Sequence, residues 1–544
     1  MRIGIYHGYE LTGSGSNEYT RYLARALSAE GHDVHVVCRE PEPERMEFAG
    51  KIVFWDRSGA IRKSVRTERA PNNCTIHQIP HAMVRPVYLT DKQRPGNTKS
   101  FAELTDAELE DYHLLNVRVL AGVLAAVQPD VLHANHLVYQ PVVCAEACAK
   151  TGTPFIIFPH GSAIEYTVRK DPRYWARAGH ALDACDGIIT GNREVLDRLS
   201  SLYPDRAKAI ESKAQIVGVG VDTSLFTPVS RDHRRQTVSA FPASRAAGKT
   251  AEQTTELHHL LREDGISVTR EFWHAYDHEV PDADVEAKLS AIPWGKNILL
   301  YVGALTAGKG VQSLIAAMPA ILAREPDTHL VIVGSGAYRE VLEALVYVMA
   351  SGDEQLLTEL TERGFDLDRS ELSGPWRDIA HYLTTTEGRA SIMRHGESML
   401  RRVHFTGRLN HDELAHVFPC SDLALFPSIV PEAYPLVLME SLSNGVLPLV
   451  SYFSGFRDGV DELRPMLGAG LISRMKIPVE PETRISKLAD NVNTLLSAGR
   501  PDACKDDLRA IAVARYDWSL RAGQLTAAYE NVLTGRRCVQ ARSA

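Results

Sequence analysis

Glu432 and Glu440 are the residues whose type and setting point most directly to chemistry. An apolar strand is expected to end at Pro427, a loop then presents Glu432, and a helix begins near Pro435, where a missing N–H costs nothing. Glu440 follows the apolar run Leu436–Met439. A carboxylate on an apolar helix is costly unless it binds something, and the paired hydroxyls of a ribose suit a bidentate acceptor. A surface glutamate on an amphipathic helix is the alternative.

A glycine-rich loop with a single lysine is expected between a strand and a helix at Gly303–Gly310. Lys309 on such a loop can neutralise a phosphate. The loop is not a P-loop, because that motif requires Ser or Thr after the lysine and here Gly310 follows. A lysine that is merely solvated is the alternative.

A second glycine-rich loop, Thr12–Asn17, precedes the first expected helix. Gly13 and Gly15 would let the backbone approach a ligand, and the helix N-terminus would offer N–H groups to an anion. Glu18 stands where the dinucleotide fingerprint needs its third glycine, so an NAD-dependent oxidoreductase fits poorly. A plain tight turn is the alternative.

The composition excludes several classes of protein. The chain has 544 residues, with 68 acidic and 60 basic side chains and a formal net charge of −8, so no basic excess exists to bind nucleic acid. No apolar run is long enough to span a bilayer, and the N-terminus lacks the apolar core of a signal peptide. The 8 cysteines show no metal-ligand spacing. We therefore expect a cytoplasmic protein with buried thiols and no bound metal.

Strand-like and helix-like segments alternate over the first 228 residues. Apolar strands are expected at Arg2–His7, Asp33–Cys38, Val131–Ala134, Phe155–Phe158 and Gly187–Thr190, with a weaker one near Thr75–Ile79. A long helix is expected at Glu108–Gln128, whereas residues 41–107 are mixed. This alternation implies a mostly parallel sheet with helices on both faces.

The alternation stops near Pro228 and restarts at about residue 293. The expected strands are Ile298–Val302, His329–Val333, Val403–Thr406, Leu423–Pro427 and Leu447–Val450. Residues 229–292 and 351–400 are polar and helix-prone, which indicates helical insertions. We predict an α/β fold of two doubly wound, Rossmann-like lobes, 1–228 and 293–518. Because each lobe binds ligands at the carboxyl ends of its strands, the two are expected to face a central cleft.

Together these features resemble the retaining glycosyltransferases of family four, which have two Rossmann-like lobes in the GT-B fold. Glu432 and Glu440 match the Glu-x7-Glu signature of that family, and Gly303–Gly310 resembles its Gly-Arg-Leu-x-x-x-Lys-Gly loop. Three further segments resemble the passage to the second lobe, the strand before the base-binding loop and the start of the final helix: Val219–Pro228, Val403–Gly407 and Asp517-Trp518-Ser519. The resemblance implies that a helix at about 519–536 packs back on the first lobe.

The resemblance also implies a nucleotide-diphosphate-sugar donor. The implied donor-binding residues are Gly13, Gly15, Lys309, Arg408, Leu409, Glu432, Leu436, Val437 and Glu440. Glu440 would hold the ribose hydroxyls, and Glu432 would contact the sugar. Lys309 would pair with the diphosphate, helped by backbone N–H groups, while Arg408 and Leu409 would lie beside the base.

Three residues of the first lobe complete the predicted site. His160 matches the histidine that this family places close to the sugar, although its spacing alone favours a structural loop histidine. Asn135 and His136 follow another strand and are candidates for the acceptor side, with structural capping equally open. His160, Lys309 and Glu432 form the predicted catalytic set.

In this family, retention is usually explained by attack on the face from which the diphosphate leaves, with the departing phosphate taking the proton of the acceptor. The resemblance therefore implies a reaction without metal or cofactor, from a nucleotide-sugar to a sugar, small-molecule or lipid-linked acceptor. A non-catalytic nucleotide-sugar-binding protein and a nucleotide-sugar epimerase of the same fold are the alternatives. Ala304 replaces the usual diphosphate arginine, and Ala433 and Pro435 replace frequent glycines. Whether the chain forms a homo-oligomer stays open.

Overall fold

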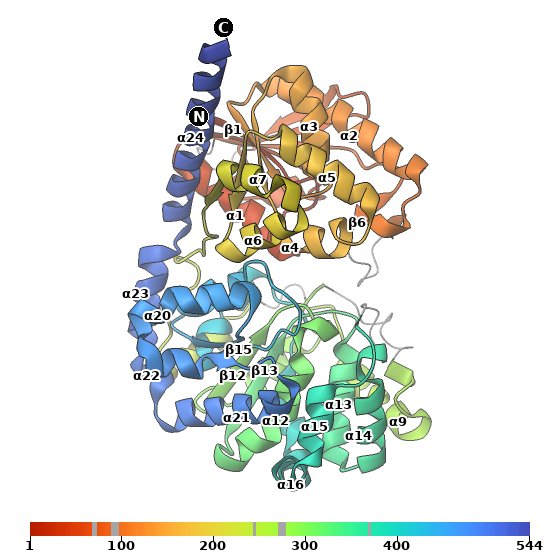
Figure 1. The fold of residues 1–544 in the computed structure, drawn as a ribbon. Coiled ribbons are helices and arrows are strands. Elements are labelled where there is room, and N and C mark those ends of the chain that lie inside the picture. Colours follow the sequence, from red (N-terminus) through yellow and green to blue (C-terminus); the bar gives the residue numbers. More distant parts are fainter. Residues whose placement is uncertain (68–72, 89–96, 243–245, 270–278, 368–371, 544) are drawn as a thin grey trace. The chain divides into compact units, whose positions relative to one another are not determined.

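Figure 1 shows the computed structural model, which describes residues 1–67, 73–88, 97–242, 246–269, 279–367 and 372–543. The chain divides into two compact units. Unit 1 contains the described residues up to Gly220 and from Tyr516 onward, and unit 2 contains those of Val221–Arg515. The C-terminal helix therefore belongs to the same unit as the N-terminus.

Unit 1 is built on a sheet whose described strands follow the order β11-β10-β9-β8-β1-β2-β5-β3-β4. These strands are β1 (Arg2–Tyr6), β2 (Asp33–Cys38), β3 (Lys51–Trp55), β4 (Ile61–Arg66), β5 (Cys74–Gln78), β8 (Val131–Asn135), β9 (Phe155–Phe158), β10 (Gly187–Thr190) and β11 (Ala214–Ile216). Neighbouring strands pair in parallel, except that β3 and β4 are antiparallel. The central strands are apolar and buried, as expected where helices cover both faces of a sheet.

The helices of unit 1 lie between these strands in the chain, except for the C-terminal α24. They are α1 (Gly15–Ala29), α2 (Asp106–Val127), α3 (Gln140–Thr151), the short α4 (Gly161–Ala163), α5 (Pro172–Ala184), α6 (Arg193–Leu202), α7 (Ala207–Lys213) and α24 (Trp518–Ser543). Figure 1 shows α24, at the blue end of the chain, running beside the red α1, and these two helices are in contact. The hydroxyl of Tyr529 on α24 also hydrogen-bonds Nδ1 of buried His133 on β8, at 2.8 Å. The last helix is therefore part of the core of unit 1.

Unit 2 is built on a sheet whose described strands are all parallel, in the order β14-β13-β12-β15-β16-β17. They are β12 (Asn297–Val302), β13 (Thr328–Val333), β14 (Val403–Phe405), β15 (Leu423–Phe426), β16 (Leu447–Ser451) and β17 (Lys476–Ile477). The helices that follow individual strands include α12 (Val311–Arg324), α13 (Arg339–Ser351), α19 (Leu436–Ser443), α20 (Ser454–Arg474) and α21 (Pro481–Ser497). Helix α23 (Lys505–Arg515) ends the unit.

The two segments expected to be insertions are helical where they are described. Residues 229–292 contain α8 (Arg234–Ser239), α9 (Ala251–Asp264) and α11 (Val285–Ala291), and residues 351–400 contain α14 (Glu354–Arg363), α15 (Arg377–Thr384), α16 (Thr386–His395) and the start of α17 (Met399–Arg402). Both segments belong to unit 2.

The first insertion is anchored to the sheet of unit 2 by a buried ion pair. Arg234 donates from Nη1 and Nη2 to Asp422 at 3.0 and 2.8 Å, and Asp422 also accepts from the backbone N–H of Ile298 at 2.7 Å. Asp422 and Arg234 are both fully buried, so this contact joins the insertion to the starts of β12 and β15. The insertion is thus an integral part of unit 2.

The prediction of two Rossmann-like lobes is confirmed. The main omission concerns residues 41–107, which contain β3 and β4 as well as a small sheet of β6 (Arg85–Val87) and β7 (Thr98–Ser100). In the same region, β5 corresponds to the weaker strand expected near Thr75–Ile79. β4 was missed because its sequence, IRKSVR, is charged and its residues are mostly exposed, as befits an edge strand. Among the described residues, no helix is both long and apolar enough to cross a membrane.

Candidate functional site

Each unit carries its predicted site residues at the carboxyl ends of its strands, and several of them lie where the order of the strands reverses. In unit 2, β12 lies between β13 and β15, so the chain proceeds to opposite sides from this strand. Ligands of open α/β sheets bind at such a point, outside the carboxyl ends of the strands. The loop Gly303–Gly310 leaves β12 there, and the loop Pro427–Pro435 leaves β15.

The structure brings Lys309 and Glu432 together at this point. Nζ of Lys309 lies 2.5 Å from Oε1 of Glu432, and Ser428 donates from its hydroxyl to the same carboxylate oxygen at 3.0 Å. The side chains of Lys309 and Glu432 are 32% and 19% exposed, so solvent reaches both. A cation and a carboxylate from separate loops thus stand side by side.

The two loops are fastened to each other through backbone groups. The N–H of Ile429 donates to the carbonyl of Gly308 at 2.8 Å, and the hydroxyl oxygen of Ser428 lies 3.2 Å from the same carbonyl oxygen. Gly310 has a φ of 71°, and a Cβ there would lie 1.8 Å from the carbonyl oxygen of Pro427. Only glycine can therefore follow Lys309 in this structure.

Arg484 on α21 hydrogen-bonds the turn that precedes Glu432. Its guanidinium donates to the carbonyl oxygens of Pro427 and Ser428 and to the hydroxyl of Ser451. The side chain is only 2% exposed. A buried arginine that spends its donors on backbone carbonyls fixes their positions, so Arg484 supports the loop that presents Glu432.

The start of α20 also forms hydrogen bonds with the backbone of Glu432. The hydroxyl of Ser454 and the N–H of Gly455 donate to the backbone carbonyl of Glu432 at 2.8 and 2.9 Å. Ser454 has a φ of 50°, a left-handed conformation that costs a non-glycine residue on the order of 1 kcal/mol and is concentrated at functional sites.

The predicted N–H donors lie at the start of α19. Pro435 is the N-cap and no side chain caps the helix, while Leu436 and Val437 in the first turn are partly exposed. One turn later, Glu440 is buried at 5% exposure, with its Oε1 3.3 Å from Nε2 of His411. The predicted ribose-binding carboxylate therefore already has a histidine neighbour, which the sequence analysis did not identify.

Arg408 and Leu409 follow β14, and a strand-like part of the first insertion runs beside them. The N–H of Arg408 donates to the carbonyl of Val280 at 3.1 Å, and its guanidinium lies 3.3 Å from Oε2 of Glu279. The N–H of Asp282 donates in turn to the carbonyl of Thr406 at 2.8 Å. The first insertion therefore sets the path of the loop that holds Arg408.

In unit 1, the strand order reverses at β1, which lies between β8 and β2. Gly13 has a φ of 110°, and Gly15 opens α1 behind the N-cap Ser14. Asn135 ends β8 and is fully buried, and His160 follows β9 and is partly exposed. Oδ1 of Asn135 lies 3.1 Å from Nε2 of His160. The predicted residues of unit 1 thus share one edge of the sheet, the edge formed by the carboxyl ends of the strands.

His136 is surrounded by the rings of other aromatic and histidine side chains at this edge. It is 1% exposed, and none of the described residues hydrogen-bonds either of its ring nitrogens. Its ring centroid lies 4.7 Å from that of His160, 5.0 Å from that of Tyr88 and 5.4 Å from those of His7 and Tyr9. Burial, together with repulsion from His160 and His7, lowers its pKa well below the usual range. Its φ of 69° is left-handed, as at Ser454.

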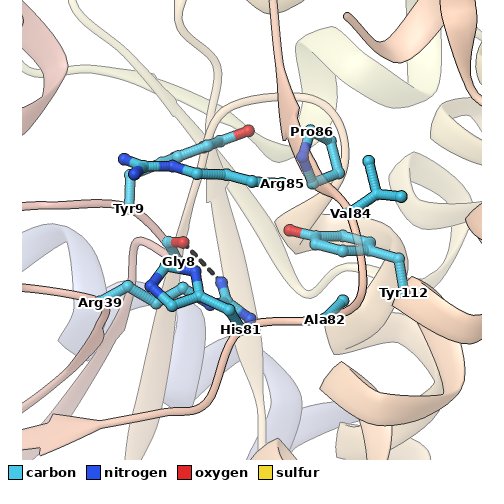
Figure 2. Close-up of a pocket in the computed structure, with 9 residues that line it drawn as sticks. All are labelled: Gly8, Tyr9, Arg39, His81, Ala82, Val84, Arg85, Pro86 and Tyr112. Carbon is cyan, nitrogen blue, oxygen red and sulfur yellow. Dashed lines mark hydrogen bonds between the residues drawn. The ribbon is translucent and has the colours of Figure 1, made fainter. Parts of the chain in front are cut away.

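A hollow opens next to these rings, and Tyr9 and Tyr112 are among the residues that line it (Figure 2). Arg39 and Arg85 contribute the positive charge of its wall. Nη1 of Arg39 donates to the carbonyl of Gly8 at 2.6 Å, the dashed line in Figure 2, and Arg85 pairs with Glu10 at 2.5 Å. Because Tyr9 also contacts His136, the hollow adjoins the predicted acceptor side.

Metal-ligating side chains do not gather in the described parts of the chain: no group of three or more His, Cys, Asp or Glu is placed to hold an ion there. The predicted independence of metal is a statement about the reaction, and it stays a prediction.

Two family models match the chain. Residues 14–210 match the glycosyl transferase 4-like domain, and residues 283–359 and 394–503 match glycosyl transferases group 1. The gap in the second match falls within the predicted insertion at 351–400.

The chain is also similar to named proteins. It is 24% identical to phosphatidyl-myo-inositol mannosyltransferase of Mycobacterium tuberculosis over 262 residues, which is 47% of this chain and about half, 53%, of that relative. Sucrose-phosphate synthase of Thermosynechococcus elongatus shares the fold with a TM-score of 0.56 at 18% identity, over 98% of this chain and 99% of that one. HepE of Anabaena, solved with UDP-glucose, shares it with a TM-score of 0.52 at 13% identity, over 98% and 100%.

The fold and the two matched domains define the class: a transferase architecture of the GT-B type, with two Rossmann-like lobes. Within that class, they support a glycosyltransferase of the GT4 type.

Several site residues escaped the sequence analysis. Arg484 and His411 are single polar residues with no motif around them, and they reach the site only through the packing of α21 and of α18 (His411–Leu414). His7 and Asn17 form hydrogen bonds at the edge of unit 1. A signal existed for His7, because it directly follows an apolar strand.

Proposed function

We propose that this protein is a retaining glycosyltransferase that moves a sugar from a nucleotide-diphosphate-sugar to an acceptor hydroxyl, without a metal ion. Unit 2 would hold the donor, and unit 1 would supply His160 and the acceptor side. The acceptor class, a sugar, a small molecule or a lipid-linked hydroxyl, and the cytoplasmic location stay predictions.

The observation that carries the proposal is the contact of 2.5 Å between Lys309 and Glu432 beside the uncapped start of α19. A diphosphate needs a cation and free N–H groups, and the adjoining sugar needs a hydrogen-bond acceptor. Lys309, the first turn of α19 and Glu432 supply these in one place. A bound donor would take Lys309 as the partner of its phosphates and leave Glu432 to accept from a sugar hydroxyl.

The reaction needs stabilisation of the leaving group above all. The bond between the anomeric carbon and the diphosphate oxygen breaks, and its electron pair goes to that oxygen. The acceptor oxygen bonds to the same face of the anomeric carbon, and its proton passes to the departing phosphate. Lys309 and the N–H groups of Leu436 and Val437 would stabilise the charge that grows on the phosphate. No protein nucleophile takes part.

Ala304 favours the second candidate, a nucleotide-sugar-binding protein without catalysis. Lys309 is the single cation of the loop Gly303–Gly310, so the loop offers less positive charge to a diphosphate than the family pattern would. The backbone carbonyl of Ala304 accepts a hydrogen bond from the hydroxyl of Tyr301 at 2.9 Å.

A binding screen followed by a turnover assay separates the two candidates. We expect one of UDP-glucose, GDP-mannose or ADP-glucose to raise the melting temperature, because a ligand that binds only the folded state stabilises it. Release of the nucleoside diphosphate from that donor would support the transferase. Glu432→Gln should lower turnover more than donor binding, whereas the exposed control Glu482→Gln should change neither. Binding without turnover in any acceptor mixture would favour the binding protein, and absence of binding would reject both.

A further inference from the structure

The polar side chains at the edge of unit 1 form one continuous chain of hydrogen bonds. Asn17 donates from Nδ2 to the backbone carbonyl of Thr12 at 2.5 Å, and its Oδ1 lies 2.9 Å from Nε2 of His7. Nδ1 of His7 lies 3.3 Å from Nδ2 of Asn135, whose Oδ1 lies 3.1 Å from Nε2 of His160. The chain thus runs from the glycine loop before α1 to the predicted catalytic histidine.

Two backbone carbonyls, those of Thr12 and Ser16, determine the direction of the bonds in this chain. The carbonyl of Thr12 can only accept, so the amide nitrogen of Asn17 faces it and Oδ1 faces His7. Because Oδ1 also can only accept, His7 carries its proton on Nε2. Nδ1 of His7 is then an acceptor and takes a proton of Asn135.

A second anchor determines the orientation of Asn135 independently. The hydroxyl of Thr20 donates to the carbonyl of Ser16 at 2.8 Å, so it can accept from Nδ2 of Asn135 at 3.0 Å but has no further proton to give. The amide nitrogen of Asn135 therefore faces Thr20 and His7, and its Oδ1 faces His160. His160 must donate from Nε2.

We infer that His7 and Asn135 are positioning residues that hold His160 as the Nε2–H tautomer, so that Nδ1 of His160 meets the ligand as a hydrogen-bond acceptor. None of the described residues bonds Nδ1 of His160, and the side chain is partly exposed. The ligand group at this nitrogen must be a donor, such as a hydroxyl, and not a phosphate or carboxylate oxygen. The assignment of that hydroxyl to a sugar rests on the proposed function, but the tautomer does not.

Neighbouring groups keep His160 neutral in this arrangement. The ring of His136 lies 4.7 Å away, and those of Phe158 and Tyr19 lie 5.3 and 5.5 Å away. Burial, with repulsion from His7 and His133, lowers the pKa of His160 well below its usual range. Burial also lowers the pKa of His7 to about 4, against the hydrogen bonds that its side chain makes to Asn17 and to the backbone of Glu10. Both rings are thus neutral at pH 7, as the chain of bonds requires.

Histidine-selective ¹⁵N labelling of the full chain tests the inference without substrate. Long-range ¹H–¹⁵N correlations distinguish the two tautomers, and His7→Gln and His160→Ala assign the signals. We expect the Nε2–H tautomer of both rings to be more than about tenfold more populated than the Nδ1–H tautomer at pH 7. A ratio of this size corresponds to the free energy of one buried hydrogen bond. An Nδ1–H ring at either position would overturn the inference, even if no variant of Asn135 folds.

Asn135→Asp supplies the sharpest variant. A carboxylate cannot donate to Nδ1 of His7, while Asn17 still holds the proton on Nε2. The pKa of His7 should therefore rise, because Nδ1 takes up a proton, and the pKa of His160 should rise beside the new charge. Thr20→Val is the matched control, because Asn17 still fixes the direction of the chain, and both tautomers should be unchanged. An unaltered pKa of His7 in Asn135→Asp would contradict the inference. If both tautomers behave as expected but no nucleotide-sugar is turned over, the proposed function fails and the positioning role stands.

Discussion

Lys309 is the residue on which the proposed chemistry depends most. Without an arginine at position 304, it is the only cation of its loop. The charge on the leaving diphosphate grows in the transition state, so the contact should strengthen there. We expect Lys309→Ala to lower turnover about 100-fold, equivalent to a charged hydrogen bond of roughly 2–3 kcal/mol, and to lower donor affinity less.

The control for this variant is Lys296→Ala, which removes an exposed lysine of the same unit that pairs with Asp327. Steady-state kinetics should show parental turnover for the control. Full turnover in Lys309→Ala would mean that the phosphates are held elsewhere.

Glu440 presents a different case, because it is buried beside His411. Glutamine keeps the shape but replaces a charged acceptor by a neutral one, so Glu440→Gln should cost about 1.5–3 kcal/mol of donor binding if both ribose contacts suffer. Titration calorimetry with the nucleoside diphosphate measures this directly. Equal affinity in the variant and the parent would refute the ribose role and leave Glu440 as the structural partner of His411.

At the scale of elements, the first insertion is tied to the core of unit 2 by a second buried ion cluster. Arg339 on α13 donates to both oxygens of Asp282 at 2.6 and 2.7 Å and to Glu343 at 2.8 Å. Lys249 of the insertion donates to Glu343 at 2.5 Å. Since Asp282 also directs the segment beside Thr406, this cluster links the insertion to the loop that carries Arg408.

Removal of one member of such a cluster leaves the other charges buried without their partner. Arg339→Met should destabilise unit 2 by about 3–5 kcal/mol, because buried carboxylates lose their counter-charge. The matched control Arg363→Met breaks a half-exposed pair with Glu359 and should cost less than about 1 kcal/mol. Thermal melts of both variants give the comparison. Similar shifts for the two would show that the cluster contributes no more than a surface pair.

The same cluster predicts a pH dependence of stability. Burial raises the pKa of Glu340 to about 7 against the attraction of Lys249, so ionisation opposes folding and stability is lost as the pH rises from about 5 through 7. Glu343 behaves in the opposite way. Although burial raises its pKa, Lys249 and Arg339 lower it to about 2, so its contribution is lost only as the pH falls below about 4.5.

Glu340→Gln isolates the first effect. The melting temperature of the variant should rise relative to that of the parent as the pH is raised from about 4 to 7. The difference should vanish near pH 4 and below, where Glu340 is protonated in both the folded and the unfolded state. A constant difference across this range would show that Glu340 does not change its ionisation there.

At the scale of the whole molecule, the sequence was sufficient for the architecture of both units. The strands Asp33–Cys38, Phe155–Phe158 and Gly187–Thr190 were predicted with their observed bounds, because buried parallel strands are short, apolar and framed by turns. Edge strands such as β4 lack this signal.

The candidate site was predictable only in part. Lys309 and Glu432 could be predicted because they lie in loops with recognisable sequence motifs, and the structure places them in contact. Arg484, His411 and His7 act through contacts between segments far apart in the chain, and one sequence carries no record of those contacts.

The stereochemistry of donor turnover tests the central proposal most directly. The donor that stabilises the chain would be incubated with it in the presence of EDTA, and ¹H NMR would record the anomeric configuration of the first product, before mutarotation if water is the acceptor. We expect a product with the configuration of the donor, formed at a rate that EDTA leaves unchanged. An inverted product, or turnover that EDTA abolishes, would contradict it.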